Sequence, residues 1–99
     1  MDEILFLCTG NTCRSPMAEG MFRALHGEEK TGLHAASAGL FTTDGLPASV
    51  YAVEAAAEFG ADIHAHASRM LTAEMAQNAK YLVCMTGAHY DRVLEMFPQ

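Results

Sequence analysis

Five residues separate Cys8 from Arg14 near the start of the chain, and Ser15 follows directly. Between a strand and a helix, a loop of this length turns its backbone N–H groups toward one centre. With the positive end of the helix dipole, these groups form an anion cradle. Gly10 and Asn11 are residue types that tolerate the left-handed backbone angles of such a turn. The Arg14 guanidinium can hold two phosphate oxygens at once. This cradle loop, residues 8–15, therefore predicts a phosphate-binding site.

The same surroundings predict a reactive sulfur at Cys8. A thiol beside an arginine and a helix N-terminus loses its proton readily. A thiolate at the base of a phosphate cradle is placed for in-line attack on phosphorus, and Ser15 can donate to the sulfur and stabilise it. We therefore expect a cysteinyl-phosphate intermediate that is later hydrolysed. The alternative is a small core cysteine that ends a strand, beside a solvated arginine.

Apolar runs and helix start signals predict the elements that position this loop. Residues 4–7 are continuously apolar, which is typical of a strand buried in a parallel sheet. Ser15 is expected to cap a helix that runs to about residue 26, with Pro16 at its first position. A helix over 48–59 is expected to direct Val50, Val53, Ala56 and Ala57 inward. The remaining expected elements are strands over 33–37 and 80–85, and helices over 72–79 and 87–97 with Thr72 and Thr86 as their caps.

The order of these elements predicts the fold class. Alternating strands and helices imply βαβ units, and hence a three-layer α/β/α arrangement around a parallel open sheet. In such sheets ligands bind beyond the carboxyl ends of the strands, where the first strand delivers Cys8. No linker, repeat or low-complexity tract divides the chain, so residues 1–99 are expected to be a single domain.

The composition argues against several function classes. The net charge is −6 and the chain holds only six Lys and Arg, which argues against a nucleic-acid partner. No apolar run approaches the ~18 residues of a membrane helix, and the acidic start at Asp2 and Glu3 argues against a signal peptide. The three cysteines lack the spacing of a disulfide framework or a metal site. We therefore expect a cytoplasmic protein without a metal or other cofactor.

The run LFLCTGNTCRSPMAE, residues 5–19, resembles the signature of the low-molecular-weight protein tyrosine phosphatase family. Further family markers follow in order: Ser37-Ala38-Gly39, then His66, Arg69 and Thr72, then YLVCMT over 81–86. The similarity extends over essentially the whole chain. It implies a phosphorylated protein as substrate, inorganic phosphate or sulfate as a ligand of the cradle, and the family sheet of four strands in the order 2-1-3-4.

The resemblance also implies roles for the residues of the cradle loop. Cys8 would be the nucleophile, Arg14 the ligand of the phosphate and the transition state, and Ser15 the group that stabilises the thiolate. Asn11 would lock the loop through its strained backbone. The phosphate-binding positions would be Thr9, Gly10, Asn11, Thr12, Cys13 and Arg14.

Three implied roles lie beside the cradle, and each has an alternative. His66 would hydrogen-bond to Asn11 or be a solvated loop histidine, with His64 as a competing candidate. Phe41 would form a hydrophobic wall at the pocket rim or be tucked into the core. Cys13 would form a reversible disulfide with Cys8 that protects the nucleophile from over-oxidation, or be a merely buried thiol.

Thr12 bears on the choice of substrate. Many phosphotyrosine enzymes of the family have a larger aliphatic residue at this position, whereas a threonine is similar to the branch that hydrolyses phosphoarginine on proteins. A short side chain with a hydroxyl can orient a polar guanidinium group. The resemblance leaves phosphotyrosine and phosphoarginine both open, with phosphoarginine slightly favoured.

The general acid of the family has no counterpart in the sequence. Family members carry a later Asp-Pro loop, and none of the four aspartates here, Asp2, Asp44, Asp62 and Asp91, precedes a proline. The fourth strand and the last helix are absent as well. We therefore expect a C-terminally truncated chain with impaired catalysis, because general acid–base assistance contributes about 10²–10⁴-fold. The strand over 80–85 would then be an open edge that allows self-association.

Two other functions compete with a working phosphatase. One is a catalytically impaired phosphate-binding fragment that uses the cradle without turnover. The other, less favoured, is a thioredoxin-coupled arsenate reductase, which needs further cysteines near the end of the third strand. At the end of that strand the chain has Thr86 instead of a cysteine, and no cysteine follows Cys84, which argues against this alternative. Cys84 itself is expected to be an inert core residue.

Overall fold

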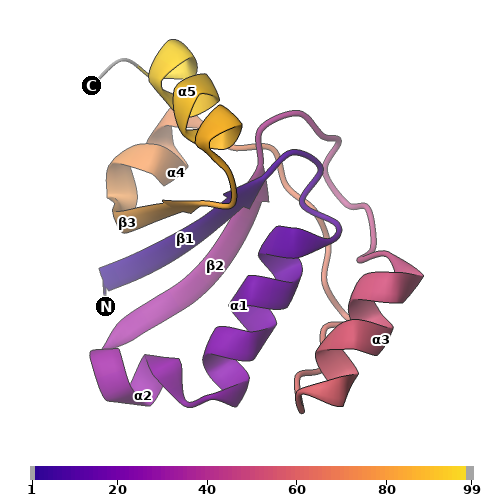
Figure 1. Cartoon of the computed structure of the whole chain (residues 1–99). Helices are drawn as coiled ribbons and strands as arrows, with labels where there is room; N and C mark the ends of the chain where they lie inside the picture. Colours follow the sequence, from indigo (N-terminus) through magenta and orange to yellow (C-terminus); the bar gives the residue numbers. More distant parts are fainter. Residues whose placement is uncertain (1, 98–99) are drawn as a thin grey trace.

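A computed structural model describes residues 2–97 of the chain. Strands and helices alternate along it, and Figure 1 shows the strands between α1 on one side and α4 with α5 on the other. This confirms the predicted three-layer α/β class. The elements in order are β1 (Asp2–Cys8), α1 (Arg14–Ala24), α2 (Gly27–Thr31), β2 (Leu33–Gly39), α3 (Val50–Glu58), α4 (Ala73–Asn78), β3 (Ala79–Cys84) and α5 (Gly87–Met96).

The described residues form a parallel sheet of three strands in the order β2-β1-β3. β1 is the central strand, and Leu7 lies between Ala38 of β2 and Cys84 of β3. The carboxyl ends of all three strands therefore meet at one edge of the sheet. Cys8, the last residue of β1, stands at this edge, where ligands bind in open α/β sheets.

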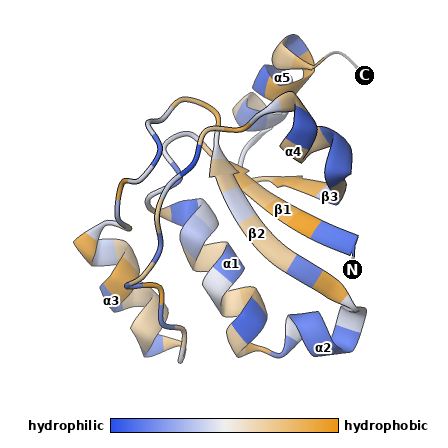
Figure 2. Ribbon diagram, turned by 180° about the vertical axis from the view of Figure 1, so that it is seen from behind, coloured by the Kyte–Doolittle hydropathy of each residue, from blue (hydrophilic) through white to orange (hydrophobic). Residues whose placement is uncertain are grey.

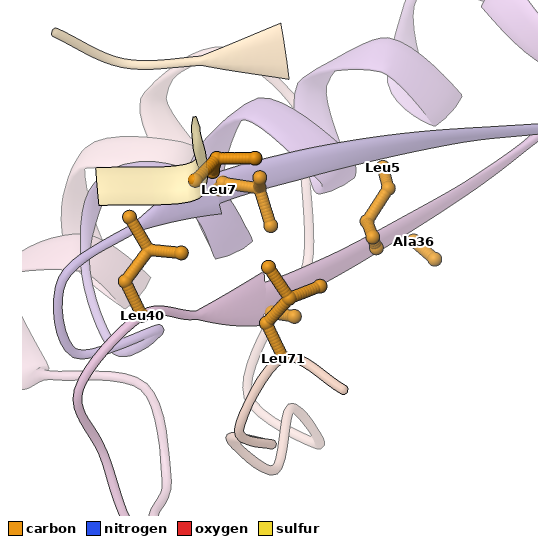
Figure 3. Close-up of a cluster of buried hydrophobic side chains, with 7 residues drawn as sticks. Leu5, Leu7, Ala36, Leu40 and Leu71 are labelled. Carbon is orange, nitrogen blue, oxygen red and sulfur yellow. The ribbon is translucent and has the colours of Figure 1, made fainter. Parts of the chain in front are cut away.

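The main core lies between the sheet and the α4–α5 layer. Leu5 and Leu7 have 0% exposed surface and point to this side, because alternate residues of a strand share a face. Figure 3 shows them with Ala36 of β2 and with Leu40 and Leu71 from the loops. Each fully buried leucine contributes about 1.5–3 kcal/mol. This packing holds the end of β1 in place below Cys8.

The other face of the sheet packs against α1. Phe6 of β1 meets Phe22 of α1 with ring centroids 5.9 Å apart. α1 in turn packs against α3, whose buried residues are Ala52 and Ala56. Figure 2 shows that β1 is hydrophobic beyond its first residues, as a central strand covered on both faces must be, whereas α2 is hydrophilic. None of the helices within residues 2–97 has the length and apolar character needed to cross a membrane.

Two sequence expectations about α1 and α3 are wrong. α1 begins at Arg14 with Cys13 at its N-cap position, and Ser15 is its second residue rather than its cap. The Ser15 hydroxyl instead forms hydrogen bonds with Cys8 Sγ and with Asn11 Nδ2. Val50 is 73% exposed and Ala57 is exposed as well, because α3 packs on α1 through Ala52 and Ala56. The expected inward positions of Val53 and Ala56 are confirmed. The predicted caps Thr72 and Thr86 are confirmed, since each side chain accepts a backbone N–H of its helix.

Candidate active site

The cradle loop joins the end of β1 to the start of α1 (Figure 1). Three of its backbone carbonyl groups accept hydrogen bonds from later segments of the chain. Cys8 O accepts from Leu40 N and Thr9 O from Phe41 N, both at 2.9 Å. Thr12 O accepts from Ser49 N at 2.7 Å. The loop is thus bonded on its outer side to the segments that follow β2. Because peptide N–H and C=O groups point in opposite directions, this arrangement turns the N–H groups toward the inside.

The backbone N–H groups of residues 9–14 donate to no acceptor within residues 2–97. Unpaired backbone donors are rare in folded proteins unless water or a ligand takes them up. Successive N–H groups that converge at a helix N-terminus make a site for an anion. The loop therefore has the geometry of an oxyanion cradle, with Cys8 at its base.

Asn11 holds the cradle loop from its centre. Its side chain has 0% exposed surface, and its backbone φ of 55° lies in the left-handed region. Its Nδ2 donates to Ser15 Oγ at 2.8 Å and to Ser37 Oγ at 3.0 Å. Its Oδ1 accepts from Arg69 N at 2.9 Å. The buried amide is thus bonded at both of its ends, which offsets the strain of the positive φ.

The sulfur of Cys8 is buried and lies 2.9 Å from Ser15 Oγ. The Ser15 oxygen already accepts from Asn11 Nδ2, which can only donate. The Ser15 proton is therefore free to point at the sulfur. A hydroxyl donor in this position can assist the sulfur when it departs from phosphorus.

Arg14 is exposed at the first position of α1, beside the cradle. No acidic residue within residues 2–97 pairs with its guanidinium. The guanidinium thus keeps its donors for a ligand. A buried sulfur, converging N–H groups and an unpaired arginine together can bind a tetrahedral dianion and attack its central atom.

Comparison with known proteins agrees with this geometry. Residues 3–99 match the family described as low molecular weight phosphotyrosine protein phosphatase. The chain belongs to this family. It is 42% identical over 97 residues to a protein-arginine-phosphatase of Geobacillus stearothermophilus, covering 98% of this chain and 63% of that protein. It is 37% identical over 98 residues to the low molecular weight protein-tyrosine-phosphatase Etp of Escherichia coli K12, covering 99% of this chain and 64% of Etp.

A solved structure adds a related fold with a modified site. It is a YwlE arginine phosphatase mutant with a phosphorylated active-site serine, and it matches with a TM-score of 0.90 and 38% identity. The match covers 99% of this chain and 63% of that chain. The chain thus spans a little under two thirds of the length of these phosphatase relatives.

The structure separates the two histidines that compete for the contact with Asn11. His66 Nε2 donates to Asn11 O at 2.6 Å, and the carbonyl acceptor requires the proton on Nε2. His64 is exposed and pairs with Asp62 at 2.5 Å. The expected contact of His66 with Asn11 is therefore present, and the solvated alternative is wrong.

The structure excludes one of the two alternatives for each of two further side chains near the cradle, Phe41 and Cys13. Phe41 is 80% exposed, so the expectation that it is tucked into the core is wrong. Its backbone N–H is bonded to Thr9 O, which places it beside the cradle. Cys13 is exposed and free, so it is not a buried thiol. Cys84 is partly buried in β3, and burial raises the pKa of its thiol above the usual value.

Sequence reasoning missed two groups near the cradle. His89 of α5 is buried, and its Nε2 lies 3.0 Å from Thr9 Oγ1. Burial, and then the Arg14 guanidinium, lower the pKa of His89 below its usual value. Glu19 of α1 accepts a 2.5 Å bond from Ser37 Oγ, the partner of Asn11. One sequence feature could have identified His89: it falls in the first turn of a helix that follows a parallel strand.

Proposed function

We propose that this chain carries the nucleophile site of a protein phosphatase, with Cys8 as nucleophile and Arg14 and Ser15 as catalytic partners. The observation that carries the proposal is a buried sulfur, 2.9 Å from the Ser15 hydroxyl, at the start of a loop whose backbone N–H groups find no acceptor within residues 2–97. The residues that would bind the phosphoryl oxygens are Thr9, Gly10, Asn11, Thr12, Cys13 and Arg14. His66 and Phe41 act as supports, through Asn11 and Thr9 respectively.

The proposed reaction has two steps. The Cys8 thiolate attacks phosphorus, an S–P bond forms, and the bond to the leaving oxygen or nitrogen of the substrate breaks. The leaving group takes up a proton from solvent. Water then attacks phosphorus and releases a proton to solvent, inorganic phosphate departs, and the S–P bond electrons return to sulfur as thiolate. Donors aimed at the developing charge stabilise both transition states, and the Ser15 hydroxyl assists the departing sulfur.

The relatives support this proposal and bear on the substrate. One related structure holds a phosphorylated active-site serine, and the relatives include a protein-arginine-phosphatase and a protein-tyrosine-phosphatase. Thr12 is half-buried in the cradle loop, and Ser49 N–H donates to its carbonyl. We infer a phosphorylated protein as substrate, with phosphoarginine favoured over phosphotyrosine because the small polar Thr12 leaves room for a guanidinium group.

A rapid-quench experiment tests the nucleophile. The chain is mixed with excess p-nitrophenyl phosphate, quenched in acid and digested, and the peptide that carries Cys8 is examined by mass spectrometry. A phosphocysteine at Cys8, absent from Cys8→Ser, supports the proposal. Phosphate binding without any phosphocysteine would leave only the alternative of a phosphate-binding fragment.

The Thr12→Ile variant tests the substrate preference. Its rates on phosphoarginine and phosphotyrosine peptides are compared with those of the wild type, and an unchanged preference overturns the argument from Thr12.

The two edges of the sheet differ, and this supports a proposal about self-association. At β2, side chains cover the edge: Glu28 accepts from Ala35 N at 2.8 Å and Arg69 Nε donates to Ser37 O at 2.9 Å. The outer edge of β3 has no strand beside it within residues 2–97, and a groove of about 490 Å³ lies between β3, α4 and α5. Unpaired edges are templates for another strand.

We propose that β3 of this chain pairs with β3 of a second copy. Light scattering after gel filtration is expected to give a dimer, and Tyr81→Lys, which places a charge on the exposed part of β3, is expected to give a monomer. A monomeric wild-type chain at high concentration overturns this proposal. It leaves the proposal for Cys8 unaffected, because the cradle lies on the central strand.

A further inference from the structure

His89 is the only one of the five histidines that is buried, with 6% of its surface exposed. It stands in the first turn of α5, where its backbone N–H is bonded to the cap Thr86. Met85 N donates to Leu7 O at 3.2 Å, so the chain leaving β3 stays beside the end of β1 before α5 begins. This path brings the start of α5 to the end of the sheet where the cradle loop lies (Figure 1), and His89 reaches that loop from it.

The contact that His89 makes there is with the first residue after the nucleophile. Its Nε2 lies 3.0 Å from Thr9 Oγ1, and 80 positions of sequence separate the two residues. On its other side, Thr9 O accepts from Phe41 N at 2.9 Å. Thr9 is thus held between α5 and the loop after β2. A shift of Thr9 would move the first peptide of the cradle and the rim residue Phe41 together.

The protonation of His89 follows from its surroundings. Burial and the Arg14 guanidinium lower its pKa, so the ring is neutral near pH 7 and carries a single proton. Nδ1 is buried and has no hydrogen-bond partner within residues 2–97. A buried N–H without a partner is a rarer defect than a buried acceptor without one. The proton therefore belongs on Nε2, which donates to Thr9 Oγ1.

We propose that His89 is a positioning residue for the phosphate cradle, which acts by donating from Nε2 to the Thr9 hydroxyl and so ties the cradle to the start of α5. This inference rests on the proposed function of the cradle. His89 touches neither the sulfur nor the phosphoryl group in this role. Its effect is to hold Thr9 where the converging N–H groups match a tetrahedral anion, and small misplacements of such groups are costly.

Three substitutions at His89 separate the hydrogen bond from the packing of the ring. His89→Gln places a polar atom near the position of Nε2, whereas His89→Asn reaches only the position of Nδ1, and His89→Phe fills the space without a donor. The rate of Cys8 phosphorylation by saturating p-nitrophenyl phosphate is expected to fall roughly five- to tenfold in His89→Asn and His89→Phe, the effect of one lost hydrogen bond. His89→Gln is expected to remain within about twofold of the wild type.

A double-mutant cycle tests whether the effect passes through Thr9. Thr9→Val removes the hydroxyl and keeps the shape, so it is expected to cause the same loss as His89→Asn. In the Thr9→Val background, His89→Asn is expected to add no further loss. Equal rates for the Gln and Asn variants, or additive losses in the cycle, would overturn the proposal.

A spectroscopic measurement does not depend on catalysis. In ¹⁵N-labelled protein, the His89 ring is expected to show a protonated Nε2 and an unprotonated Nδ1, and the opposite tautomer contradicts the assignment. The affinity for inorganic phosphate, measured by calorimetry, is expected to weaken in His89→Asn and to be retained in His89→Gln. If wild-type Cys8 is not phosphorylated at all, the proposed function fails, whereas the affinity and the tautomer still decide the role of His89.

Discussion

Asn11 Nδ2 donates to Ser15 Oγ at 2.8 Å, and this bond decides what the Ser15 hydroxyl can do. The amide nitrogen has no lone pair to offer, so Ser15 accepts from it and keeps its own proton for the Cys8 sulfur at 2.9 Å. The orientation of the hydroxyl toward the sulfur thus comes from a neighbouring buried amide. Asn11 itself has a left-handed backbone, with a φ of 55°.

Ser15→Ala is expected to slow both the formation and the hydrolysis of phosphocysteine. The variant loses a hydrogen bond to a charged sulfur, which corresponds to roughly 10- to 100-fold in rate. Rapid-quench measurement of the decay of labelled phosphocysteine checks this, with the affinity for inorganic phosphate as the control, since Ser15 faces the sulfur and not the bound oxygens. An unchanged decay rate would show that the hydroxyl does not assist the sulfur.

Asn11→Ala and Asn11→Gly are expected to destabilise the fold to different extents. Both variants lose the bonds of the buried amide to Ser15, Ser37 and Arg69, at a cost of roughly 2–4 kcal/mol. The glycine adopts the φ of 55° without strain, so it is expected to be about 1 kcal/mol more stable than the alanine. Urea unfolding of both variants measures the difference. Equal stabilities would mean that the loop has relaxed away from the left-handed conformation.

Cys13 is proposed to form a reversible disulfide with Cys8 under oxidation. Both thiols are free, Cys8 at the base of the cradle and Cys13 on its exposed side. Brief treatment with hydrogen peroxide is expected to give a disulfide that dithiothreitol reverses with full recovery of Cys8 phosphorylation. Cys13→Ser is expected to lose Cys8 irreversibly to higher oxides, and Cys84→Ser serves as the control that keeps protection. Equal recovery of Cys13→Ser and the wild type would contradict the pairing.

The stability of the fold is expected to depend on pH through His89. Its pKa lies below the ordinary value of 6.5 because of burial and the Arg14 charge. As the pH falls below the ordinary value of 6.5, His89 of the unfolded chain binds a proton while His89 of the folded chain stays neutral. The free energy of unfolding therefore decreases until the pH reaches the lower pKa of the folded state. Urea unfolding between pH 7 and about pH 5 checks this against His89→Gln, which lacks this contribution. Parallel curves for the two proteins would mean that His89 titrates normally.

The features that the sequence by itself determined are local ones. The apolar run of residues 4–7, the strand-loop-helix order around Cys8 and Arg14, and the caps Thr72 and Thr86 all follow from the conformational preferences of neighbouring residues. The alternation of strands and helices was enough for the parallel sheet, because βαβ connections admit few topologies. The same local reasoning failed at Ser15, which has the residue type of a cap and is recruited by Cys8 and Asn11 instead.

Only the tertiary structure decided which distant residues reach the cradle. It placed His66 rather than His64 on Asn11, left Phe41 outside the core and brought His89 to Thr9 across 80 residues. These contacts depend on strand order and register, since the sheet brings the ends of β1, β2 and β3 to one edge. The type of a residue and its neighbours in sequence do not determine which strand will lie beside it. The packing of the whole chain determines this.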